Sequence, residues 1–162
     1  MNTWIALITS LPTENATARM RAWRSLKASG AAVLRDGVYL MPEREDCRNT
    51  LDSVATDVRA AEGTALVVRL EEPTDGNFIA LFDRSAEFAN LLGDISTARE
   101  GLSPDSANDA LKQARKLRKA FTNLAVIDFF PGGARKQADE ALRDLEQRAA
   151  WALSPDEPHP VN

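Results

Sequence analysis

The chain has 162 residues, of which 44% are hydrophobic, 27% charged and 6% aromatic. Such an apolar share is ordinary for soluble globular proteins and argues against a disordered or collagen-like chain. The formal charge of −4 excludes a generally basic nucleic-acid coat protein, but it leaves a local basic patch open because binding depends on where the charges lie.

Cysteine usage and hydropathy predict a soluble, cytoplasmic protein. Cys47 is the only cysteine, so no internal disulfide can form. The first apolar run, residues 4–8, is too short for a signal sequence and has no basic segment before it. No window approaches the roughly 20 apolar residues that a membrane span requires. We therefore expect no contact with a membrane.

The chain opens with two elements of clear type. Residues 4–8 predict a buried strand, because the run is almost continuously apolar. Residues 15–29 predict a helix that is capped by Asn15 or Thr13 and ends before Gly30.

The first predicted helix has an apolar and a basic side. At about 100° per residue, its inward face is expected to hold Ala16, Met20, Trp23 and Leu26. It carries four bases and no acid between them, and Arg21 and Arg24 project from the outer flank. Arginine forks match oxyanions, so this flank is a candidate phosphate surface. Pairing with Asp36, Glu14 or acids of the next helix is the alternative.

A hairpin is expected next. Residues 31–35 and 38–41 are short β-prone runs joined by Asp36 and Gly37. Asp-Gly between apolar runs predicts a type I′ turn, which needs two residues that tolerate positive φ. Pro42 stops the second strand.

A helix over residues 45–61 and a strand over residues 65–70 complete the first half. The helix presents three apolar residues at helical spacing: Leu51, Val54 and Val58. The order strand, helix, hairpin, helix, strand is that of a ferredoxin-like split βαβ sheet.

The second half predicts helices over residues 78–95, 105–121 and 134–153. The segment 127–133 is too hydrophobic for a free linker, so we expect it to pack on the protein. The sequence thus predicts three parts: a ferredoxin-like subdomain over 3–72, a helical extension packed on it over 73–153, and a Pro-rich linker or tail over 154–162.

The most distinct charge feature lies in the helix 105–121. It consists of four bases within an arc of about 100° opposite Leu117 and Phe121, namely Lys112, Arg115, Lys116 and Lys119. Such a stripe predicts contact with a phosphate backbone, and a solvated outer face is the alternative. In residues 134–148, by contrast, four bases are matched by four acids.

Catalytic and metal-binding patterns are missing from the sequence. Cys47 and His159 are the only soft or imidazole ligands, and they lie far apart. Neither a Ser-His-Asp arrangement nor a Gly-rich phosphate loop of known spacing is present. Residues 131–133 precede a helix and form either a turn or an anion-binding helix start. We expect no enzyme activity, catalytic residue, metal or cofactor.

Four segments together resemble one bacterial family. Residues 11–24, 34–42, 81–88 and 127–132 resemble the N-terminal domain of ChrB, the chromate-resistance regulators. The resemblance implies a cytoplasmic transcriptional regulator that controls a chromate efflux operon, with promoter DNA as its partner and a homodimer as its expected state.

A weaker resemblance supports the fold. Residues 30–42 are similar to the Cas2-like part of PaaX-type repressors, which implies an α+β fold: a ferredoxin-like (Cas2-like) split βαβ sheet followed by a helical C-terminal extension. Cas2 nucleases hold a metal with an acidic residue at the end of the first strand. Residues 7–10 contain no carboxylate, so a nuclease is not expected.

ChrB proteins typically continue past a Ser-Pro-rich linker into a second domain. The segment 154–162 resembles that linker, so the chain is either a stand-alone form or an N-terminal half. The resemblance therefore implies that chromate is sensed by a C-terminal domain absent from this chain.

Three functional hypotheses follow. The first is a DNA-binding regulatory module that contacts phosphates through the α-helical bases Arg21, Arg24, Lys112, Arg115, Lys116 and Lys119. The alternative is a dimerisation or interaction module that does not touch DNA and uses apolar area from Phe78, Phe82, Phe88, Trp151 and Leu153. The third is direct capture of chromate by the Arg-rich first helix.

Overall fold

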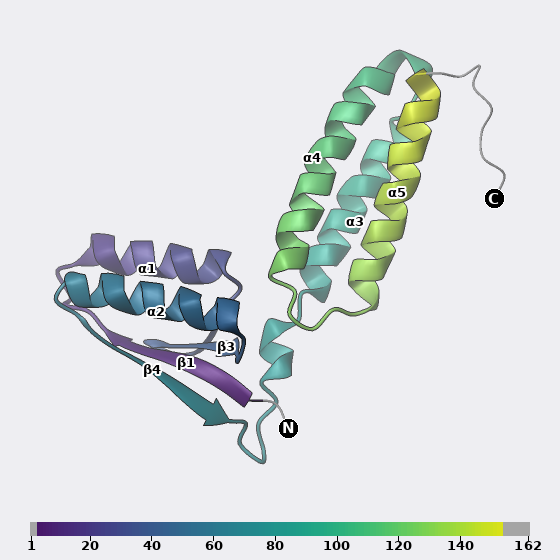
Figure 1. The fold of residues 1–162 in the computed structure, drawn as a ribbon. Helices are drawn as coiled ribbons and strands as arrows, with labels where there is room; N and C mark the ends of the chain where they lie inside the picture. The colour runs from purple at the N-terminus through teal and green to yellow at the C-terminus, as the bar shows by residue number, and fades with distance from the viewer. Residues whose placement is uncertain (1–2, 154–162) are drawn as a thin grey trace. The chain divides into compact units, whose positions relative to one another are not determined.

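The structure is a computed structural model that describes residues 3–153 (Figure 1). It forms two compact units, with the first ending at Asp83 and the second beginning at Arg84. The sequence analysis places a boundary after residue 72 instead. The difference arises because residues 78–82 pack on the sheet. The predicted packing of the helical part on the sheet part stays a prediction, and the segment 154–162 lies outside the described residues.

The first unit is built around a four-stranded antiparallel sheet with helices between its strands. Its elements are β1 (Thr3–Ser10), α1 (Ala16–Ala28), β2 (Ala32–Arg35), β3 (Val38–Pro42), α2 (Glu45–Ala60), β4 (Thr64–Glu71) and the short helix η1 (Ile79–Phe82). The strand order is β2-β3-β1-β4, and every neighbouring pair is antiparallel. The predicted order of elements is confirmed, as is the α+β class.

The two faces of the sheet are covered differently. Ile5 and Leu7 of β1 are fully buried on the face covered by α1 and α2 (Figure 1). Trp4 points to the other face, because side chains alternate along a strand. There its ring stacks on Phe82 with centroids 5.4 Å apart and meets the edge of Phe78 at 5.6 Å. These rings cover only the Trp4 end of that face.

The packing face of α1 differs from the predicted one. Leu26 is buried, but Ala16 is exposed and Met20 is 47% exposed. The inward side instead follows Ala18, Ala22 and Leu26. The predicted N-cap is confirmed, since the Asn15 side chain accepts a hydrogen bond from the backbone N–H of Ala18.

The hairpin forms where predicted, but its turn is not type I′. Of the two turn residues, Gly37 has a positive φ, +76°, and Asp36 does not. A type I′ turn requires a positive φ at both. The register shifts between Val33 and Arg35, so a bulge takes up the difference. Gly37 is required here, because a Cβ atom on it would lie 2.8 Å from the carbonyl oxygen of Thr9.

The second unit is a bundle of three helices: α3 (Ser85–Glu100), α4 (Ala107–Val126) and α5 (Gly133–Leu153), with a 3₁₀ turn η2 (Pro104–Ser106) before α4. The continuous helix predicted over residues 78–95 is wrong. The backbone is extended at Asp83, between η1 and α3. Phe82 packs on Trp4 in the first unit and Phe88 packs in the bundle core, so one straight helix does not serve both rings.

The bundle core explains the remaining helices. It joins apolar residues from all three of them: Phe88, Leu91, Ile95, Ala114, Leu117, Phe121, Ala138, Leu142 and Leu145. The segment between α4 and α5 is not a free linker, since Asp128 is buried and Phe129 and Phe130 are half-buried. No helix within residues 3–153 is long and apolar enough to cross a membrane.

The apolar surface proposed for a dimer is in large part internal. Phe78, Phe82 and Phe88 are buried in the cores of their own units, because each ring fills a gap between neighbouring elements. Trp151 is half-buried, whereas Leu153 is exposed. The prediction that the three phenylalanines offer apolar area to a partner is therefore wrong.

Candidate nucleic-acid interface

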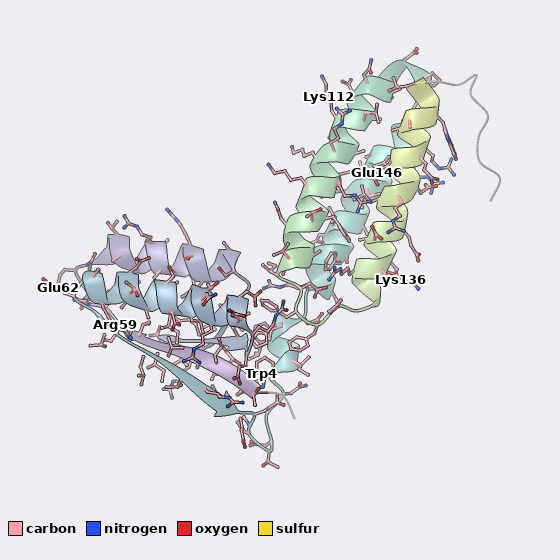
Figure 2. All side chains as sticks on the ribbon, viewed as in Figure 1. Trp4, Arg59, Glu62, Lys112, Lys136 and Glu146 are labelled. Atoms are coloured by element: carbon pink, nitrogen blue, oxygen red, sulfur yellow. The ribbon has the colours of Figure 1, made fainter. Side chains whose placement is uncertain are left out.

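The basic stripe is formed by the outer side of α4. The inner side of this helix is fixed by buried apolar residues at helical spacing, namely Ala107, Ala110, Ala114, Leu117 and Phe121. Burying that side turns the opposite arc to solvent. The four predicted bases all lie on this arc and are exposed: Lys112, Arg115, Lys116 and Lys119. In Figure 2, Lys112 projects from α4 away from α5.

Arg118 is the one base of this stretch that lies off the stripe. Its guanidinium donates from Nη2 to Glu146 Oε1 at 2.6 Å and from Nη1 to Asp139 Oδ1 at 2.9 Å, both on α5. Its Cζ also lies 5.3 Å from the centre of the Phe121 ring. The hydrogen bonds to Glu146, ahead of those to Asp139, raise the pKa of Arg118 despite partial burial. Arg118 therefore holds α4 to α5.

The four bases of the stripe differ from Arg118 in having no acidic partner. None of them forms an ion pair with a residue of the described range 3–153. Asp109, the acid at the edge of their arc, lies in the first turn of α4, where a carboxylate stabilises the helix dipole. The stripe thus presents uncompensated positive charge.

The bases of α5 and its neighbours show the opposite pattern. Arg143 pairs with Asp139 at 3.1 Å and Arg148 pairs with Asp144 at 3.0 Å. Arg135 approaches the buried Asp128 at 3.7 Å. Three of the four bases in residues 134–148 therefore lie beside an acid, whereas Lys136 is exposed and forms no ion pair with a described residue.

Arg21 and Arg24 lie together on the outer side of α1, in the first unit. Both are exposed, and they border a shallow hollow with Ala16, Thr17 and Met20. The alternative that they pair with acids is not observed among the described residues. The six predicted residues therefore form two groups, one on each unit.

The α4 stripe also holds two polar residues that were not predicted as part of it. Asn108 and Asn123 are exposed and fall within the same arc as the four bases at about 100° per residue. Their amides can hydrogen-bond phosphate or sugar oxygens. Both could be found from the sequence, because Asn108 lies one helical turn before Lys112 and Asn123 lies one turn after Lys119.

Groups suited to metal binding do not gather in the described part of the chain. No cluster of three or more histidine, cysteine or acidic side chains that could hold a metal occurs in residues 3–153. Cys47 is buried in α2, and burial, together with the Asp46 carboxylate, raises the pKa of its thiol to about 11. His159 lies outside the described residues. What the two basic groups can do chemically is bind anions.

Comparison with known proteins places this geometry in a family. The family model described as "Protein ChrB, N-terminal" matches residues 19–152. The chain is 38% identical over 161 residues to Protein ChrB of Cupriavidus metallidurans strain CH34, covering 98% of the chain and 50% of that protein, so it spans about half of this relative's length.

A solved structure shares the fold. It is an uncharacterised protein of Mycobacterium tuberculosis with 18% identity and a TM-score of 0.51, and the match covers 94% of this chain and 64% of that one. The similarity extends over both units and speaks to fold alone. The family match and the identity to Protein ChrB together show that the chain belongs to the ChrB N-terminal family.

Proposed function

We propose that this chain is the DNA-binding module of a ChrB-type transcriptional regulator of chromate resistance. In this proposal it contacts promoter DNA of a chromate efflux operon without catalysing a reaction. The sheet unit is then ferredoxin-like and Cas2-like, an assignment that the strand order β2-β3-β1-β4 supports. Chromate is sensed, on this proposal, by the part of the longer regulator that this chain does not include.

The unpaired stripe on α4 is the observation that carries the proposal. Three of the bases of α5, Arg135, Arg143 and Arg148, lie beside acids. Exposed cations without partners stay free to displace counterions from a phosphate backbone, which is the main source of nonspecific DNA affinity. Lys112 and Lys119 lie two helical turns apart, so the stripe follows a backbone over about 10 Å.

Phosphate contacts give the proposal a measurable signature. Each neutralised phosphate adds about −0.9 to the slope of log affinity against log salt concentration. The stripe alone therefore predicts a slope near −4 if each base binds one phosphate. Base readout is not assigned to any residue, because lysine and arginine contacts to phosphate fix position rather than sequence.

The test is promoter affinity measured by fluorescence anisotropy at several salt concentrations. The duplex is the DNA upstream of the chain's own operon. The double variant Lys112→Gln with Lys116→Gln should bind more weakly and make the slope less negative by about 2. The control variant Arg143→Gln with Arg148→Gln removes the same charge from α5, at bases that pair with Asp139 and Asp144, and should leave the slope unchanged. Equal effects of the two variants would overturn the assignment of α4.

The contribution of α1 is tested in the same assay. The double variant Arg21→Gln with Arg24→Gln should by itself make the slope less negative by about 2. The quadruple variant, which adds the two α4 changes, should make the slope less negative by about 4 if both units bind one duplex. A combined effect no larger than that of α4 alone removes Arg21 and Arg24 from the proposed interface.

Self-association into a homodimer is the second candidate, and it rests on the sheet face opposite the helices. Ile8 pairs with Leu66 and Val38 across the strands, so these side chains share that face. Ile8 is 42% and Leu66 56% exposed, and the polar pair Ser10 and Thr64 borders them on the same face. Light scattering should give the mass of a dimer for the wild-type chain. Leu66→Glu should reduce this mass to that of a monomer, whereas the control Val126→Glu on α4 should leave it unchanged. A monomeric wild-type chain at 100 µM, on the order of the concentrations that reveal weak dimers, contradicts this candidate.

A further inference from the structure

A cavity of about 390 Å³ lies within the first unit, among α1, the end of β1 and the β2–β3 turn. Cavities of roughly 300–1,000 Å³ are the size that holds small organic ligands. The apolar side chains that offer it surface are Leu11 and Ala22, both half-buried, whereas Leu26 and Val58 border it but are 0% and 2% exposed. Leu11 and Ala22 therefore form a small apolar floor in a cavity whose other lining groups are largely polar.

The polar groups lie around this floor. Arg19 and Asp36 are both exposed and line the cavity, but they form no ion pair with each other or with any other described residue. The Arg19 guanidinium donates one hydrogen bond, from Nη2 to the Pro12 carbonyl at 3.2 Å. Its remaining N–H groups are available to a ligand.

Tyr39 adds a phenol to the same cavity. Burial raises the pKa of Tyr39, the Asp36 carboxylate raises it further and Arg19 opposes them, so both charges lie near its ring. The ring is positioned by Trp23, whose centroid is 6.2 Å away. Its hydroxyl makes no hydrogen bond with another residue of the described chain, which leaves both its donor and its acceptor capacity to a ligand.

The wall that carries Tyr39 is rigid. The backbone N–H and the Oγ1 hydroxyl of Thr9 both donate to the Gly37 carbonyl, at 2.8 and 3.2 Å. These bonds fix the β2–β3 turn against the end of β1. Polar groups held in this way before a ligand arrives bind it with a smaller loss of entropy.

We infer that this cavity binds a small organic acid, whose carboxylate meets Arg19 and whose apolar body lies on Leu11 and Ala22. The planar guanidinium matches a carboxylate in a bidentate geometry, and the Tyr39 hydroxyl can donate to the same group. A bare inorganic oxyanion would leave the apolar floor uncovered. The site goes beyond the proposed DNA contacts, and its binding is measured without DNA.

The experiment follows amide chemical shifts of the labelled chain during titration with four probes: benzoate, hexanoate, benzyl alcohol and chromate. Benzoate and hexanoate should shift the amides of Thr9, Ser10 and Gly37 in a saturable way. Benzyl alcohol, which lacks the carboxylate, should bind about tenfold more weakly. Chromate should leave these amides unmoved, because it has no apolar body.

Two variants separate the roles of charge and space. Arg19→Gln should weaken benzoate binding about tenfold, whereas Arg21→Gln, which removes the same charge from the outer side of α1, should not change it. Ala22→Leu fills the cavity and should abolish binding while the other amide signals show a folded chain. Absence of saturable shifts at millimolar benzoate overturns the inference, as does unchanged binding in Arg19→Gln. Stronger shifts with chromate than with benzoate overturn the ligand class.

Discussion

Arg118 and Lys119 are adjacent bases of α4 whose loss should have opposite consequences. Arg118 makes three charge-assisted hydrogen bonds to Asp139 and Glu146, at 2.6, 2.9 and 3.2 Å, with its side chain 31% exposed. An exposed ion pair contributes about 0–1 kcal/mol, and hydrogen bonds to charged groups contribute about 1.5–3 kcal/mol when water is excluded. For this partly buried network we expect Arg118→Met to cost about 2 kcal/mol, which lowers the Tm of the second unit by about 10 °C.

Lys119→Met is the matched control, since it removes the same charge and introduces the same side chain one position later. Lys119 is exposed and unpaired, so its loss should change stability by less than about 0.5 kcal/mol. Circular dichroism melts followed at the helical band measure the stability of both variants. In the promoter assay, Lys119→Met should weaken DNA binding more than Arg118→Met does. Equal Tm values of the two variants would refute the division between structural and DNA-facing bases. So would a salt slope that becomes less negative by about 1 in Arg118→Met and not in Lys119→Met.

Three further predictions concern single residues of the two units. Gly37→Ala should destabilise the chain by about 1–3 kcal/mol in urea unfolding, because φ is +76° and the new Cβ would meet the Thr9 carbonyl. Gly93→Ala in α3 should stabilise it by about 0.5–1 kcal/mol, since a Cβ there meets nothing within 4 Å; a loss of stability would contradict the open environment. Cys47 should react with a disulfide reagent at pH 8 only after unfolding, because burial raises its pKa to about 11 and leaves little thiolate; rapid reaction of the folded chain would contradict this.

The sheet unit could be predicted from local signals because its elements are short, capped and separated by strong turn residues. Asn15 and Gly37 act through local preferences, a side-chain cap and a positive φ, whereas Pro42 is the last residue of β3 and not the residue that follows it. The face of α1 could not be predicted in the same way. Met20 fits the periodic pattern, but the helix turns so that Ala22 and Leu26 meet the sheet, and that rotation is decided by tertiary packing.

The break between η1 and α3 had no local signal either. Phe78 and Phe82 lie four residues apart, as on one helical face, and the sequence contains no glycine or proline between Phe78 and Phe88. The chain interrupts the helix because two separate cores compete for these rings: Trp4 stacks on Phe82, and Phe121 lies 5.7 Å from Phe88. A periodic pattern identifies which residues are buried, but not which core buries them.

The candidate site was more predictable than the core around it, because amphipathic α4 leaves one arc for exposed charge. The sequence gives the net charge, but it could not show which charged side chains have an ion-pair partner and which do not. Interactions among exposed charges are screened over about 8 Å at physiological ionic strength, so a DNA strand responds to the charges nearest to it. Asp139, Asp144 and Glu146 count toward the net charge of −4, yet each already has an arginine partner. The bases of the α4 stripe have none among residues 3–153, so positive charge is concentrated on that surface although the protein as a whole is acidic.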